Sequence, residues 1–68
     1  MISKREREVL AYLAHGLTTE QTAARMGLSP QTIKTHIGSA FKKLKVQNRH
    51  GAFLELGWLH PPHIEEKE

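Results

Sequence analysis

The sequence predicts a single all-α domain of four helices. Four stretches of its 68 residues carry apolar side chains at helical spacing, and each lies beside residues that typically begin or end helices. A chain of this length holds one domain, whose core is thin unless a partner adds buried surface. It contains no cysteine, so neither a disulfide nor a thiolate metal site stabilises it.

The first helix is expected over residues 4–14. Ser3 and Glu6 have the spacing of a capping box, in which each side chain accepts a hydrogen bond from the other residue's backbone N–H. The apolar residues that follow at helical spacing are Val9, Leu10, Leu13 and Ala14. Gly16 tolerates the left-handed conformation that ends many helices, so the helix stops just before it.

A short second helix is expected between a cap at Thr18 or Thr19 and a stop at Gly27. Its inner face consists of Thr22, Ala23 and Met26. Only Leu28 then precedes Ser29, which is a good N-cap and is followed by a proline, the residue favoured at the first helical position. Two helices joined by about four residues that include a glycine form a helix-turn-helix. We expect Leu28 to fill the gap between them.

The third helix, over residues 30–44, has the clearest periodicity. Its inward stripe consists of Ile33, Ile37, Ala40 and Leu44, with His36 and Phe41 on the flanks. The opposite side carries Gln31, Lys34, Thr35, Gly38, Ser39 and Lys42. That side is polar and has no carboxylate, and its small residues would allow the backbone to approach a groove wall. Gly38 costs up to about 1 kcal/mol relative to alanine, which favours a steric reason for it, although chance drift explains it equally well.

A last helix is expected after the N-cap Asn48, ending at Gly57. Its inward residues are Ala52, Phe53 and Leu56, and we expect Trp58 and Leu59 to fold back onto the core. Pro61 and Pro62 cannot continue a helix. The chain therefore divides into a folded domain over residues 1–59 and a flexible acidic tail over residues 60–68.

The charges are segregated along the chain, whose net charge is +3. No Asp or Glu occurs between Glu20 and Glu55. The basic residues of this stretch are Arg25, Lys34, Lys42, Lys43, Lys45 and Arg49. A contiguous basic half with acids outside it is typical of a protein that binds a polyanion, although it also fits a solvated helix face.

No feature of the sequence favours an enzyme. It has no Ser-His-acid arrangement and no glycine-rich phosphate loop. His60 and His63 flank two prolines in the tail and make a poor metal site, so no metal and no cofactor is expected. The chain also lacks a membrane-spanning apolar run and the apolar core of a signal peptide. We therefore expect a cytoplasmic protein with no membrane partner.

Several runs of residues carry a resemblance to a known family. They are Ser3-Lys4-Arg5-Glu6-Arg7-Glu8-Val9-Leu10, His15-Gly16-Leu17, Ala23-Ala24-Arg25-Met26-Gly27-Leu28-Ser29, Thr32-Ile33-Lys34-Thr35-His36-Ile37, Lys42-Lys43-Leu44, Val46 and Asn48-Arg49. In this order, and without gaps across residues 2 to 59, they resemble the DNA-binding domain of the LuxR/GerE family of bacterial transcription regulators. The resemblance implies a four-helix fold, a third helix that enters the major groove, and dimeric binding to paired half-sites. Single-domain members of the family exist, and Met1 with the acidic tail favours a complete protein here.

The resemblance also implies which residues read bases. The family's base-reading positions fall on Lys34, Thr35 and Gly38, and Gln31 shares their face. Lys34 has donors for guanine O6 and N7, and the Thr35 methyl group can touch the methyl group of thymine. Relatives often carry a polar or basic side chain at the position of Gly38, so a direct base contact there is in doubt.

Another set of residues is expected to contact DNA phosphates: Ser29, Thr32, Lys42, Lys43, Lys45 and Arg49. Ser29 and Thr32 lie at the N-terminus of the third helix, where free N–H groups and the helix dipole attract a phosphate, although Ser29 serves first as a cap. The cations position a protein on DNA without reading its sequence. His36 borders the core face, so we expect it to pack rather than to contact DNA.

The last helix offers a surface for a second copy of the chain. Leu54 and His50 point away from its inward residues, and Trp58 is expected near them. Because the resemblance implies pairing through this helix, these three residues are the expected dimer interface. A single exposed leucine is common, however, and needs no partner by itself. RNA polymerase is a further candidate partner.

The sequence thus predicts a transcriptional regulator that binds double-stranded DNA sequence-specifically as a dimer, and two alternatives stay open. A promoter-reading domain of a sigma factor also has a capped helix-turn-helix, but it usually lacks the element found here between Val46 and Leu59. A protein-binding module that captures another regulator through its last helix is favoured by Gly38 and the acidic tail.

Overall fold

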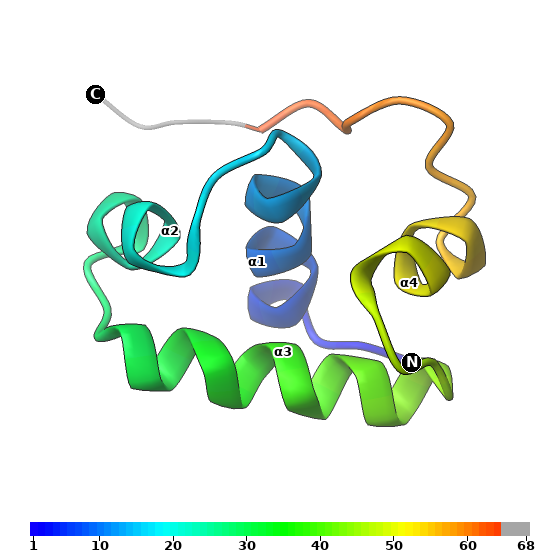
Figure 1. Ribbon diagram of the computed structural model, residues 1–68, viewed down its shortest axis with the longest axis horizontal. Coiled ribbons are helices and arrows are strands. Elements are labelled where there is room, and N and C mark those ends of the chain that lie inside the picture. Colours follow the sequence, from blue (N-terminus) through cyan, green and yellow to red (C-terminus); the bar gives the residue numbers. More distant parts are fainter. Residues whose placement is uncertain (65–68) are drawn as a thin grey trace.

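Four helices follow one another in the part of the chain that the computed structural model describes, residues 1–64. They are α1 (Lys4–Ala14), α2 (Thr19–Met26), α3 (Pro30–Leu44) and α4 (Arg49–Glu55), and no strand occurs in this part. The longest helix, α3, runs along one side of the molecule, with α1 above its middle and α2 and α4 above its two ends (Figure 1). The prediction of an all-α, four-helix fold is confirmed.

Each helix begins at a side-chain cap. The cap residues are Ser3, Thr18, Ser29 and Asn48. In each case the side-chain oxygen accepts a hydrogen bond from the backbone N–H three residues later, over 2.8 to 3.2 Å. Such a cap contributes about 1 kcal/mol to stability. All four helix starts lie where the sequence places them, and Thr18 rather than Thr19 is the cap of α2.

The helix ends are less uniform than the starts. Gly27 has a φ of +67° and caps α2 in the left-handed conformation that glycine adopts without steric cost. At the end of α3 the same conformation falls on Lys45, with a φ of +58°, although no glycine is available there. A residue with a Cβ pays about 1–2 kcal/mol for this conformation, so the end of α3 is strained.

The core consists of two clusters that share α1 and α3. One joins α1, α3 and α4 through Leu10, Leu13, Ala40 and Ala52, all buried. The other joins α1, α2 and α3 through Val9, Ala23 and Ile33. Leu28, in the turn between α2 and α3, packs against the second cluster, as predicted. Trp58 packs against the first cluster, but Leu59 is 89% exposed, so the expectation that Leu59 also folds onto the core is wrong.

After α4 the chain turns back and crosses the C-terminal end of α1 (Figure 1). The ring atom Nε2 of His15, the residue that ends α1, is hydrogen-bonded to the carbonyl oxygen of Pro62. The rest of the predicted tail, residues 65–68, lies outside the described residues. Within residues 1–64, no helix combines the length and the apolar character needed to cross a bilayer.

Candidate nucleic-acid interface

One side of α3 faces away from the other three helices along its whole length (Figure 1). Ile33 and Ala40 are fully buried on the opposite side, which fixes the rotation of α3 about its axis. The residues on the open side that are exposed are Gln31, Lys34, Thr35, Gly38 and Lys42. No described part of the chain covers Lys34 or Thr35, so this face is accessible to a partner.

The open face offers few but distinct chemical groups. The hydroxyl of Thr35 donates to the carbonyl oxygen of Gln31 over 3.1 Å, so its methyl group and its acceptor lone pairs remain for a partner. The amine of Lys34 has no partner among the described residues, and its three donors are available. A Cβ added at Gly38 would meet no atom within 4 Å, so the protein's own packing does not require glycine there.

The hydroxyl groups at the start of α3 are engaged with each other. Ser29 Oγ accepts from the Thr32 backbone N–H over 3.2 Å and lies 2.9 Å from the Thr32 hydroxyl. Pro30 has no N–H, and the N–H of Ile33 donates to the Ser29 carbonyl. Among the backbone N–H groups in the first turn of α3, that of Gln31 is therefore left without an acceptor in the described part of the chain.

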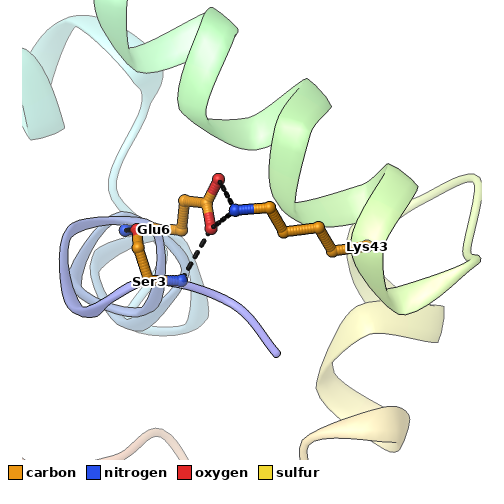
Figure 2. A network of polar contacts seen from close by, with 3 residues as sticks. All are labelled: Ser3, Glu6 and Lys43. Atoms are coloured by element: carbon orange, nitrogen blue, oxygen red, sulfur yellow. Dashed lines mark hydrogen bonds and ion pairs between the residues drawn. The ribbon is translucent and has the colours of Figure 1, made fainter.

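Lys43 forms an ion pair that joins α3 to the start of α1. Its Nζ lies 3.0 Å from Oε1 and 3.2 Å from Oε2 of Glu6, as Figure 2 shows. The same carboxylate accepts from the Ser3 backbone N–H over 2.7 Å and is only 4% exposed. Hydrogen bonds from the Ser3 backbone, the Ser39 side chain and Lys43 together lower the pKa of Glu6 to about 2, against the opposing effect of burial.

The sequence identified Glu6 only as half of a capping box and Lys43 only as a cation for phosphates. Their positions are 37 residues apart, so no local spacing reveals the pair. Part of the charge of Lys43 is neutralised within the fold. The three other predicted phosphate-binding cations are exposed and have no ion pair in the described part of the chain: Lys42, Lys45 and Arg49. The predicted phosphate contacts all remain predictions.

The predicted dimer surface combines two exposed residues of α4 with Trp58, which packs against the core as the sequence predicts. His50 is exposed and Leu54 is 63% exposed, as expected for an outward face. Trp58 is half-buried: its ring lies 5.9 Å from that of Phe53, and the Arg7 guanidinium lies 5.2 Å from its centre. Leu54 and His50 are thus the open part of the predicted dimer surface, and Trp58 belongs partly to the protein's own core.

The described residues contain no group of three or more His, Cys, Asp or Glu side chains that would hold a metal ion. The open face of α3 offers hydrogen-bond donors, a methyl group and nearby cations. These are the groups with which proteins read and grip a DNA groove.

Comparison with known proteins identifies a family with this arrangement. Residues 1–55 match the luxR family of bacterial regulatory proteins. The chain is 50% identical over 48 residues to the "Probable transcriptional regulatory protein SgaR" of Hyphomicrobium methylovorum, covering 71% of this chain and 23% of that protein. It is 39% identical over 56 residues to the spore germination protein GerE of Bacillus subtilis, covering 82% of this chain and 76% of GerE.

The transcriptional regulatory protein UhpA of Escherichia coli is 43% identical over 47 residues, which cover 69% of this chain and 24% of UhpA. The chain thus spans about a quarter of the length of SgaR and UhpA, but most of GerE. The matched residues include all of α1, α2, α3 and α4. The chain belongs to the luxR family of bacterial regulatory proteins, and its four helices form that family's DNA-binding helix-turn-helix domain.

Proposed function

We propose that this protein regulates transcription by binding duplex DNA sequence-specifically, with α3 in the major groove. The observation that carries the proposal is the open side of α3, which is polar and acid-free and lies opposite a fully buried stripe at Ile33 and Ala40. The major groove of B-DNA is about 12 Å wide and admits one α-helix. A carboxylate on this face would repel the phosphates that line the groove, and none occurs.

The base contacts in this proposal are divided among three side chains. Lys34 donates to O6 and N7 of a guanine, and Gln31 is placed one turn earlier to contact the neighbouring base pair. Thr35 supplies its methyl group to a thymine methyl, in agreement with the hydroxyl being held by the Gln31 carbonyl. Gly38 supplies no side chain, so its contribution is to let the backbone lie close to the bases.

The phosphate contacts surround this face. Lys42, Lys45 and Arg49 lie at the C-terminal end of α3 and the start of α4, and their exposed amines and guanidinium attract one DNA strand. At the other end of α3, the unpartnered N–H of Gln31 and the positive end of the helix dipole attract a second phosphate. Ser29 and Thr32 border that position with their hydroxyl groups.

The proposed DNA-bound form is a dimer in which α4 of one copy meets α4 of the other. Leu54 is 63% exposed, which is high for a leucine on a small domain, and His50 lies one turn before it on the same face. A two-fold dimer of this kind reads two half-sites in opposite orientation. Each copy then places its own α3 in the major groove.

The proposal is tested by selecting duplexes from a random pool and then measuring binding of variants to the selected site and to random DNA. Lys34→Ala is expected to weaken the free energy of binding to the selected site by about 1–3 kcal/mol and to change binding to random DNA little. Lys42→Ala is the matched control on the same helix. It is expected to weaken binding to the selected site and to random DNA by the same factor, and to reduce the slope of log affinity against log salt concentration by about one. Equal losses on both DNAs for Lys34→Ala would contradict base reading by this residue.

The same binding assay separates the proposal from a protein-binding module. A DNA-binding protein must lose affinity steeply as salt rises, because bound counterions are released from the DNA. A module that only captures another protein shifts no duplex at low or high salt. For the dimer, Leu54→Asp is expected to leave binding to a single half-site unchanged and to abolish cooperative binding to paired half-sites in a gel-shift titration.

A further inference from the structure

A basic groove with a volume of about 740 Å³ lies between α1, the end of α2 and residues 62–64. One carboxylate lines it, that of Glu8. The cationic side chains that line it are Lys4, Arg5, Arg7 and Arg25. No residue of α3 belongs to its walls, so the groove is separate from the face of α3 that is open to a DNA groove.

Tyr12 carries a polar group in this groove that the protein itself does not satisfy. The residue lines the groove and is only 7% exposed. Its hydroxyl forms no hydrogen bond within residues 1–64. A tyrosine buried to this degree usually has a hydrogen-bond partner, because a buried polar group without one costs stability. The Tyr12 hydroxyl is therefore a donor that a molecule lying in the groove would satisfy.

The cations at the start of α1 are available to the same molecule. Lys4 and Arg5 are exposed and form no ion pair within residues 1–64. They lie in the first turn of α1, where the positive end of the helix dipole attracts anions. Lys4, Glu8 and Tyr12 follow one another at intervals of four residues and so share one face of the helix. From Lys4 to Tyr12 this face is about 12 Å long, which is the length of about four residues of extended chain.

We propose that the groove binds a short, extended acidic segment of a partner protein. The carboxylates of the segment pair with Lys4 and Arg5, and one of them accepts a hydrogen bond from the Tyr12 hydroxyl. An apolar side chain of the segment packs against Met26 and Pro62, which also line the groove. These two residues favour a polypeptide over DNA as the occupant, because the phosphate backbone of DNA has no apolar side chain to place on them.

The proposal is tested with a fluorescein-labelled peptide of alternating glutamate and leucine, whose binding to the full chain is followed by fluorescence anisotropy. Tyr12→Phe removes only the hydroxyl and is expected to weaken binding about tenfold, because a carboxylate loses a hydrogen bond. Its Tm is not expected to fall, since the hydroxyl has no partner within the described chain. Lys4→Gln/Arg5→Gln is also expected to weaken binding about tenfold. A peptide with glutamine in place of glutamate is expected not to bind.

Lys42→Gln/Arg49→Gln removes the same charge outside the groove and is the matched control. At physiological salt, where the Debye length is about 8 Å, it is expected to bind the peptide as tightly as the unmodified protein does. A loss of affinity as large as that of Lys4→Gln/Arg5→Gln would overturn the proposal, and so would unchanged binding by Tyr12→Phe. Displacement of the peptide by a random-sequence duplex would also overturn it, because DNA would then be the occupant. None of these measurements uses the selected duplex, so their failure is distinguishable from a failure of base reading by α3.

Discussion

The buried carboxylate of Glu6 makes the free energy of unfolding of this protein depend on pH below about 4.5. Its pKa is lowered from the ordinary 4.5 to about 2 by hydrogen bonds from the Ser3 backbone, the Ser39 side chain and Lys43. At about 1.4 kcal/mol per pH unit, a lowering of this size corresponds to up to about 3 kcal/mol of folding free energy. The Lys43 side chain is 44% exposed, so solvent screens its share, and we expect about 1–2 kcal/mol.

The direction of the effect follows from the lowered pKa. Above pH 4.5 the carboxylate is ionised in both folded and unfolded chains, and its stabilisation of the fold is complete. As pH falls from 4.5 toward 2, the unfolded chain takes up the proton first, so this stabilisation is lost across that interval. Glu6→Gln keeps a side chain that can complete the capping box but removes the charge. The variant should therefore be less stable than the unmodified protein at pH 7 and nearly equal to it at pH 2.

The assay is urea unfolding from pH 7 to pH 2, monitored by helical circular dichroism and by the fluorescence of Trp58, the single tryptophan. Glu20→Gln, on the exposed first turn of α2, provides a control in which a carboxylate is neutralised outside the core. A difference between the unmodified protein and Glu6→Gln that stayed constant from pH 7 to pH 2 would refute the reasoning. In that case the ionised form of Glu6 would contribute nothing specific to the fold.

Three further substitutions follow from single observations. Thr22→Val is expected to raise the free energy of unfolding by about 1 kcal/mol in urea titrations, because the buried Thr22 hydroxyl has no hydrogen-bond partner among residues 1–64. A loss of stability would reveal a partner. Lys45→Gly is expected to stabilise the fold by about 1 kcal/mol in the same assay, because it relieves the positive φ at the end of α3. Gly38→Ala is expected to stabilise α3 by up to about 1 kcal/mol, since a Cβ there meets nothing. If the backbone approaches the bases at Gly38, the alanine variant should also lose affinity for the selected duplex.

The starts of the helices were predictable because each depends on residues close together in sequence. At Ser3, Thr18, Ser29 and Asn48 the capping oxygen and the N–H that it accepts from are three positions apart, so the type of residue at one position indicates the helix start. The inward stripe of α3 was predictable for a related reason. The helical repeat alone determines which side chains share a face.

What the sequence did not predict depends on how the helices pack. The pair of Glu6 with Lys43 requires the start of α1 to lie against the later half of α3, and neither residue's neighbours in sequence carry that information. The left-handed Lys45 was also missed, because the usual signal is a glycine and none is present there. The sequence predicted that Trp58 folds back onto the core, but its particular partners, Phe53 and Arg7, depend on the path of the chain after α4.

These packing contacts bear directly on the reading face, because they fix the orientation of α3. Successive residues of an α-helix are about 100° apart, so a rotation by one position would turn Lys34 toward the core in place of Ile33. The complete burial of Ile33 and Ala40 opposes that rotation. The hydrogen bond from Lys43 to Glu6 also opposes it, because it ties the later half of α3 to the start of α1. Lys43 is thus better placed to hold α3 against α1 than to leave Glu6 and form an ion pair with a DNA phosphate. On this argument Lys43→Met should weaken binding to the selected duplex more than binding to random DNA, the opposite of what a simple phosphate contact would produce.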